Sequence, residues 1–423
     1  MKLICFEIRK IFANKLVIIV LALLLAINGI VCVYYLTRTR HDLAEGSDVS
    51  EYAENYVTAL DTVISEAAAN LNQYDAQDIA VEDYVYQYQL RLIRTYSYLR
   101  DNVEFGTEST QGFDTFFDYR IADYLIFILL ILICSVVFVQ EKSTGIMPIL
   151  RTTRAGRKKT VLAKLLSILI IISFIEIIFA IETSLIIGLL DGYGGLSAPL
   201  QSLSRYIYCP YEITIGEFIL IRLLIRIIAF TLFSVVIMLS SLFTYNYVIG
   251  CLSGLGFLGI NLLLDALKDR LLGKALLANI VNVVSVGSLY ERYYAVNLFG
   301  YVIDFLPCVV LAYAVLSLIF CVLIVLKYDS LYDPHTLKII AKPRVKASVR
   351  IFGVRRWAYS GSLFISELYK SLISSRMIVV IVILLTAKCM ISYYSFQGTD
   401  SYGEAIYHEY MTELAGELSD DKE

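Results

Sequence analysis

The chain has 423 residues, of which 58% are hydrophobic and 18% charged, and its formal net charge is −3. Its mean hydropathy is +0.68. A soluble chain of this length would carry fewer apolar residues, so the composition excludes an ordinary soluble protein and indicates a membrane protein with several spans. Most of the eight cysteines lie inside apolar runs and the three histidines lie far apart. We therefore expect no disulfide scaffold, no metal site, no cofactor and no nucleic-acid partner.

Apolar runs long enough to cross a bilayer recur along the chain. The first follows four basic residues, and no small-residue cleavage site comes after it. We therefore expect a retained span rather than a removed signal peptide. In chain order the predicted spans are 16–36, 120–139, 161–190, 217–244, 247–264, 303–326 and 377–394.

Lysine and arginine set the predicted orientation. The segment 37–119 has sixteen acidic residues, five arginines and no lysine, whereas basic residues gather in 1–15, 140–160 and 327–376. Because cytoplasmic segments carry the excess of lysine and arginine, the three basic segments 1–15, 140–160 and 327–376 are predicted to lie in the cytoplasm. We expect a protein of the cell membrane with a cytoplasmic N-terminus and, after seven spans, an extracellular C-terminus in this chain.

The extracellular segment 37–119 is predicted to be helical. Apolar and tyrosine side chains recur there at three- and four-residue spacing, which is typical of one face of an amphipathic helix: Val85, Tyr88, Leu92, Tyr96 and Leu99. Two interpretations are open. The segment forms a helical cap that packs on itself, or its tyrosines contact a substrate: Tyr84, Tyr86, Tyr88, Tyr96 and Tyr98.

Two further features lie between the fourth and sixth spans. The apolar segment 275–290 is too short to cross and is interrupted by Gly287. It is predicted to be a re-entrant or interfacial helix, which is tolerated where protein surrounds it. Span five carries small residues that allow another helix to approach closely: Gly250, Gly254, Gly256 and Gly259.

The N-terminal segment has a weak repeat near the end of the chain. Shifted by about 360 positions, Glu7 meets Glu367 and Lys10 meets Lys370, and each pair precedes an apolar run. The repeat predicts a modular chain. Its parts are a six-span module over 1–327, a basic linker over 328–360, and the start of a second module over 361–423.

No catalytic constellation is found. The sequence has no G-x-x-x-x-G-K-[ST] segment, no nucleophile elbow and no zinc-type histidine pair. We therefore expect that the chain is not an enzyme and does not hydrolyse nucleotides by itself.

The segment 140–160 joins the second and third spans. Six residues in and after it, in this order and spacing, resemble the cytoplasmic segment of exporter-type ABC-transporter permeases: Glu141, Gly145, Leu150, Arg154, Arg157 and Lys164. Ala163-Lys164 fills the last position of that family's pattern, whereas Arg154 to Arg157 stand where a Pro-x-Ser-Arg turn is commoner. Span count, the Glu- and Lys-bearing start and the large outer loop extend the resemblance over 1–327.

The resemblance implies a fold, a function and partners. The fold is an all-α polytopic membrane protein with a six-span permease module and a seventh span. In such permeases the loop between spans two and three forms a short coupling helix that docks on a separate ATP-hydrolysing subunit. The implied function is export across the membrane. The implied partners are an ABC-type ATPase subunit, a second permease module from a homodimer or a tandem or split half, and membrane lipid.

Charged residues also lie inside two predicted spans. Span three contains Glu176 and Glu182, and span four contains Arg222 and Arg226. Each costs about 2.5–3.5 kcal/mol at the membrane centre, so exposure to lipid is not expected. Counting from the outer ends of the spans puts Glu182 level with Arg226, which predicts a Glu182–Arg226 pair. The pair either locks the two spans together or belongs to a substrate path.

Two other classes of function fit the same sequence. One is a membrane-embedded sensor or assembly protein whose extracellular loop binds a ligand. The other is an ion-coupled secondary transporter that uses Glu176 and Glu182 and needs no ATPase. The transported substrate does not follow from the sequence, because one fold serves many substrates.

Overall fold

A computed structural model describes residues 2–39, 49–76, 81, 83–105, 111–152, 156–244, 247–266 and 278–330. Within them, six helices are long and apolar enough to cross a bilayer. They are α2 (Lys15–Thr39), α6 (Ile121–Ser143), α8 (Lys158–Leu190), α9 (Ile215–Phe243), α10 (Tyr247–Ala266) and α14 (Phe305–Ser330). This is an all-α architecture of the multi-pass membrane class, and the six helices coincide with the first six predicted spans. The seventh, 377–394, and the repeat over 361–423 lie outside the described residues.

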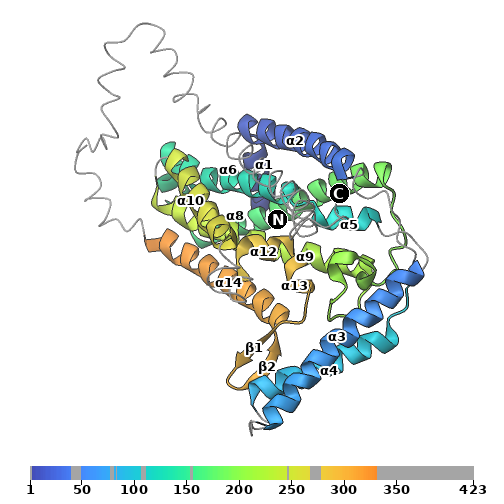
Figure 1. Ribbon diagram of the computed structural model, residues 1–423. Coiled ribbons are helices and arrows are strands. Elements are labelled where there is room, and N and C mark those ends of the chain that lie inside the picture. Colours follow the sequence, from blue (N-terminus) through green and yellow to red (C-terminus); the bar gives the residue numbers. More distant parts are fainter. Residues whose placement is uncertain are drawn as a thin grey trace, which may run out of the picture. The chain divides into compact units, whose positions relative to one another are not determined.

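Helix α6 is the central helix of this group. It packs against α2, α8, α9 and α10, and every residue from Ala122 to Val139 is buried. Its sequence is apolar on all sides, as is typical of a helix with neighbours all round it. Helix α9 extends the group, because it also packs against α14. Each of the other four spanning helices therefore contacts α6, α9 or both (Figure 1).

Glycines bring α10 close to α6. A Cβ atom at Gly254 would lie 2.9 Å from Cγ2 of Ile131, and one at Gly250 would lie 3.3 Å from Cβ of Ser135. Gly256 has nothing within 4 Å of such an atom. The prediction that span five approaches another helix is confirmed at Gly250 and Gly254, which face α6. Gly256 does not take part in that contact.

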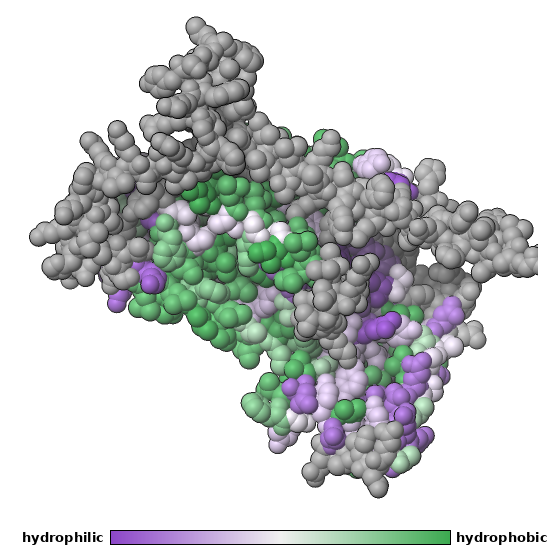
Figure 2. All heavy atoms as spheres, turned by 60° about the vertical axis from the view of Figure 1, so that its left-hand side comes forward, coloured by the Kyte–Doolittle hydropathy of each residue, from purple (hydrophilic) through white to green (hydrophobic). Residues whose placement is uncertain are grey.

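The outer faces of α10 and α14 are apolar. Leu252 and Leu263 on α10, and Leu311 and Leu318 on α14, each expose more than half of their surface. Figure 2 shows apolar side chains covering one broad face of the described helices, with hydrophilic side chains gathered below it. An apolar surface of this kind fits contact with hydrocarbon.

The described part of the segment between the first two spans is mostly helical. Helices α3 (Val49–Ala76) and α4 (Tyr84–Asn102) pack side by side. The carboxylate of Asp83 caps α4 by accepting a hydrogen bond from the N–H of Val85. The amphipathic face predicted for α4 packs inward, except for the exposed Val85. The core of this unit consists of Tyr56, Leu60, Tyr96, Leu99, Tyr293 and Ala295.

The tyrosines of α4 bond to the chain that precedes α14 and to the α8–α9 connection. The hydroxyl of Tyr84 donates to the carbonyl of Ala295 at 3.0 Å, and that of Tyr96 donates to the carbonyl of Tyr208 at 2.9 Å. Burial raises the pKa of the Tyr96 phenol, so this donor stays protonated at neutral pH. These bonds favour the packing interpretation of the α4 tyrosines over contact with a substrate.

The segment 275–290, predicted as a re-entrant or interfacial helix, is not one continuous helix in its described part. Its described part forms two short buried helices, α12 (Ile280–Ser285) and α13 (Gly287–Tyr290). They are separated by Val286, whose φ is 60°, so the helix cannot continue. An antiparallel hairpin of β1 (Ala295–Leu298) and β2 (Tyr301–Asp304) then leads into α14. The sequence analysis did not predict this hairpin.

The described chain also has shorter helices. Helix α1 (Lys2–Phe12) precedes α2, and α5 (Gln111–Asp118) leads into α6. Helix α7 (Ile146–Thr152) lies between α6 and α8. The connection between α8 and α9 contains the 3-10 turns η1 (Leu200–Ser202) and η2 (Ser204–Tyr206).

The α6–α10 contact yields a stability prediction. Gly254→Ala adds a methyl group where Ile131 leaves no room, so either the Ile131 side chain or α10 itself must shift. We expect a loss of about 1–3 kcal/mol, the range for overpacking a core, measured as a lower thermal unfolding midpoint in detergent. Gly256→Ala is the matched control, since it faces open space and adds helix propensity. Equal midpoints for the two variants would contradict the close packing.

Candidate functional site

The turn between α6 and α7 depends on Gly145. Its φ is +70°, a conformation that glycine adopts without the steric cost that a side chain would bring. The N–H groups of Thr144 and Gly145 donate to the carbonyls of Gln140 and Lys142, which closes the end of α6. The chain can then start α7 in a new direction. This gives a physical reason for glycine at the fifth position of the pattern that begins at Glu141.

A cluster of four charged residues lies where this segment leaves and re-enters the helix group. The ammonium of Lys164, on α8, lies 2.8 Å from Oε2 of Glu7 on α1 and 2.7 Å from Oε1 of Glu141 on α6. Lys10 on α1 binds the same oxygen of Glu141 at 2.5 Å. We call Glu7, Lys10, Glu141 and Lys164 the four-residue ion cluster. It joins α1 to the helices on both sides of α7.

The four-residue ion cluster is balanced in charge and is buried except for Lys10, whose side chain is 24% exposed. The side chain of Lys164 has no exposed surface, and Glu7 and Glu141 are 4% and 2% exposed. Two carboxylates and two ammonium groups sum to zero charge, which such a setting requires, because an unpaired buried charge is costly. The ring of Phe138 adds a contact 5.9 Å from the Lys164 ammonium. The resemblance had singled out Glu141 and Lys164, but not as partners.

Lys142 makes a separate connection to α9. Its ammonium is buried and donates to the carbonyl of Leu242, and it also lies 3.3 Å from the carbonyl of Ser241 and 3.2 Å from that of Thr244. These carbonyls are at the C-terminal end of α9, where a cation is favoured by the unpaired carbonyls and the helix dipole. Consecutive residues at the end of α6 thus bind different helices: Glu141 binds α1 and α8, and Lys142 binds α9.

Helix α7 presents two apolar side chains outward. Ile146 is 47% and Ile149 66% exposed, whereas Met147 is buried. Leu150 is half-buried and Arg157, just before α8, is exposed. Arg154 lies outside the described residues. Of the six residues singled out by the resemblance, the structure brings Glu141 and Lys164 together and places Gly145 and Leu150 in the intervening turn and helix.

The charges within the spans pair differently from the prediction. The guanidinium of Arg226 binds Glu176 through Nε and, at 3.3 Å, through Nη2, and it lies 2.7 Å from Oδ1 of Asp123. The predicted Glu182–Arg226 pair is wrong. Asp123 was not predicted to be a buried charge because it lies close to the start of span two. A carboxylate at that place is expected to lie at the membrane interface.

Glu182 faces another helix. It accepts a hydrogen bond from Nδ2 of Asn28, on α2, at 3.0 Å. Glu176 and Glu182 are six positions apart, which is about 240° around a helix, so they point in different directions. Counting depth from the helix ends cannot capture this difference, and it also assumes that the ends are level.

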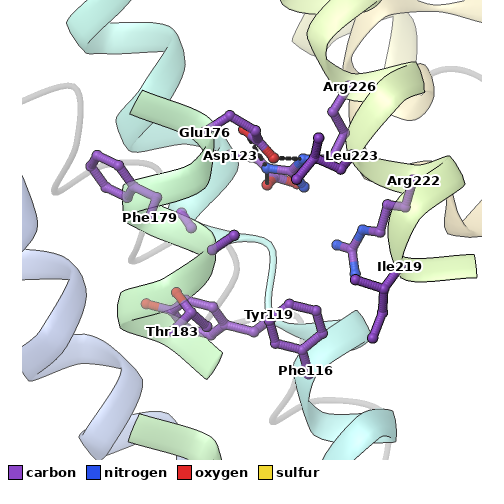
Figure 3. A pocket seen from close by; sticks show the side chains of 12 residues that line it. Phe116, Tyr119, Asp123, Glu176, Phe179, Thr183, Ile219, Arg222, Leu223 and Arg226 are labelled. Atoms are coloured by element: carbon purple, nitrogen blue, oxygen red, sulfur yellow. Dashed lines mark hydrogen bonds and ion pairs between the residues drawn. The ribbon is translucent and has the colours of Figure 1, made fainter. Parts of the chain in front are cut away.

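Arg222 lies beside the ion pairs of Arg226 but takes no part in them. Its guanidinium lies over the rings of Phe116 and Phe117, 5.6 and 5.1 Å from their centroids. It points into a small cavity between α6, α8 and α9, whose upper end holds the Arg226 pairs (Figure 3). Glu176, Arg222 and Arg226, three of the four predicted intramembrane charges, line this one cavity.

The described residues contain no group of three or more His, Cys, Asp or Glu side chains that could hold a metal ion. No protein-family model, curated protein or solved structure matches the chain. Arguments about function therefore rest on its own residues and on the arrangement of its helices.

The four-residue ion cluster yields a second stability prediction. Lys164→Met leaves Glu7 and Glu141 buried with only Lys10 to compensate them. We expect a loss of about 3–5 kcal/mol, as when one partner of a buried ion pair is removed, measured by thermal unfolding in detergent. The control is Lys159→Met, five positions earlier on the same helix and exposed. A midpoint as high as the control's would mean that the cluster does not hold these helices together.

The pairing of Arg226 can be tested by isosteric substitution. Glu176→Gln removes a charge that binds Arg226 directly, whereas Glu182→Gln keeps a group that can still accept from Asn28. We therefore expect a larger drop in unfolding midpoint for Glu176→Gln. The opposite order would favour the pairing expected from depth alone.

Proposed function

We propose that the chain is the membrane-spanning permease subunit of an ABC exporter, driven by a separate ATP-hydrolysing subunit that docks on the segment 140–160. The observation that carries the proposal is helix α7, a short helix with exposed Ile146 and Ile149 whose two flanks are bound to neighbouring helices. Exposed isoleucines between charged anchors suit a surface that enters a groove on another protein.

The proposed mechanism is mechanical coupling. When the ATPase subunits close, they push on α7. Because Lys164 binds both Glu141 and Glu7, the push reaches α6, α8 and α1 together. Lys142 carries it to the end of α9. Helices tied in this way move as a rigid body, which is how closure of a soluble subunit can change access to a path across the membrane.

The proposal includes an orientation and a second module. The segment 140–160 lies in the cytoplasm of a cell-membrane protein, in keeping with its basic residues, and the N-terminus lies on the same side. The transport path is completed by a second six-span module, supplied by a second copy or by a tandem or split partner. The apolar outer faces of α10 and α14 can contact lipid or that second module.

The test is nucleotide hydrolysis in the purified complex. The tagged chain, extracted from its own membranes in mild detergent, is expected to carry ATPase activity. Ile146→Glu combined with Ile149→Glu places two carboxylates on the docking face. Since each buried isoleucine contributes about 1.5–3 kcal/mol, the associated activity should fall at least tenfold.

The matched control is Val57→Glu combined with Val85→Glu. These residues are also exposed and apolar, each 40% accessible, but they lie on α3 and α4. The control pair should keep the associated activity. Wild-type chain that carries no ATPase activity, or a docking-face variant that carries as much as the control, would refute the proposal. Transport that depends on an ion gradient and not on ATP would point to the secondary-transporter class.

A further inference from the structure

The cavity beside the ion pairs of Arg226 is lined by one residue, Arg222, that can still donate hydrogen bonds. Its volume is about 60 Å³, several times the roughly 10–15 Å³ that one water molecule needs. The guanidinium of Arg222 points into this space from α9, opposite the side chains of α8 (Figure 3). The cavity can therefore hold a polar group of a few atoms within reach of Arg222.

Arg222 is buried without an acceptor. It is 6% exposed, and in the described part of the chain its Nη1 has no hydrogen-bond partner. The rings of Phe116 and Phe117 hold the guanidinium in place but accept no conventional hydrogen bond. An arginine has five N–H donors in a fixed fork that matches an oxyanion. A buried donor without a partner is costly, so the site favours a bound acceptor.

The acids nearby do not fill this role. Asp123 and Glu176 both bind Arg226, and no bond joins either of them to Arg222. With Arg222 included, the four residues sum to zero charge. One added negative charge is tolerated more readily than two in so apolar a place, because the cost of an unbalanced charge rises steeply as the dielectric falls. The charge balance therefore limits a bound oxyanion to a single negative charge, and Nη1 of Arg222 supplies the donor for its hydrogen bond.

The apolar surroundings suit an oxyanion that carries a hydrocarbon chain. Ala180 on α8 and Leu223 on α9 line the cavity. The next residues along the chain, Ile181 and Leu224, are 53% and 60% exposed. The apolar outer surface of both helices thus begins one position away from the cavity. A head group at Arg222 could extend a chain along that surface.

We propose that the cavity between α6, α8 and α9 binds the singly charged oxyanionic group of a small molecule or amphiphile, a carboxylate or a phosphodiester, through Arg222. The site lies within a single chain and needs neither the ATPase nor a second module. It can therefore be tested separately from transport.

The test is binding to the purified full-length chain in an uncharged glycoside detergent. Three probes are titrated by calorimetry and by thermal unfolding: decanoate, acetate and 1-decanol. A ligand that binds only the folded chain raises the unfolding midpoint saturably. We expect this for decanoate, with one molecule per chain, and not for 1-decanol. Saturable binding of decanoate alone identifies an amphiphile from the bilayer as the source, and equal competition by acetate identifies a free small anion.

Variants connect the binding to the cavity. Arg222→Gln should weaken decanoate binding at least tenfold, and Arg222→Lys should weaken it less, because the charge is kept. Ala180→Leu leaves all charges in place but fills the cavity, and should also weaken binding. This variant keeps the test informative if Arg222→Gln does not fold. Arg94→Gln, the same change at an exposed position on α4, should have no effect.

Three outcomes would overturn the proposal. They are an unchanged decanoate affinity in folded Arg222→Gln or Ala180→Leu, equal binding of 1-decanol and decanoate, and no saturable binding of either decanoate or acetate.

Discussion

The interaction on which the proposed mechanism depends is the contact of Lys164 with Glu7 and Glu141. An ammonium with no exposed surface is stable there because two carboxylates from two other helices surround it, and each carboxylate depends on the ammonium in turn. The three helices α1, α6 and α8 must therefore keep their spacing or lose a buried charge pair. That requirement fixes the two ends of the segment 140–160 relative to each other, although Ile146 and Ile149 between them are exposed.

A second group of buried charges lies farther along the same helices and has a different character. In the four-residue ion cluster every charge has a partner within 3 Å. Beside the Arg226 pairs, in contrast, Arg222 has aromatic rings as neighbours and no acceptor for Nη1. Within the described residues, Oε2 of Glu141 also lacks a hydrogen-bond partner, but the charge of Glu141 is paired with Lys10 and Lys164. Arg222 has no bonded opposite charge there, which leaves a position for a ligand. The first group fits a role in transmitting force and the second a role in binding.

Packing around α6 relates these groups to each other. Helix α6 supplies Glu141 near one end and Asp123 near the other, and apolar residues between them are buried on all sides. The glycines of α10 allow that helix to lie close to it. Movement of one end of α6 therefore displaces the other end, unless the helix bends. Binding at Arg222 and force at α7 would be linked through this helix.

Much of the helical framework follows from the sequence alone. A run of about 20 apolar residues is long enough to cross a bilayer, and within the bilayer a helix satisfies its backbone hydrogen bonds. Periodicity likewise predicted the buried face of α4, and the resemblance to a family of permeases singled out Glu141, Gly145 and Lys164. Contacts between helices were decided only by the tertiary structure. The partner of Arg226 depends on the rotation and relative height of α8 and α9, and the burial of Glu7 depends on where α1 packs. Apolar helices of similar composition can pack at many rotations and offsets, so a linear pattern shows which spans contain charges but does not decide which of these are buried or which of them meet.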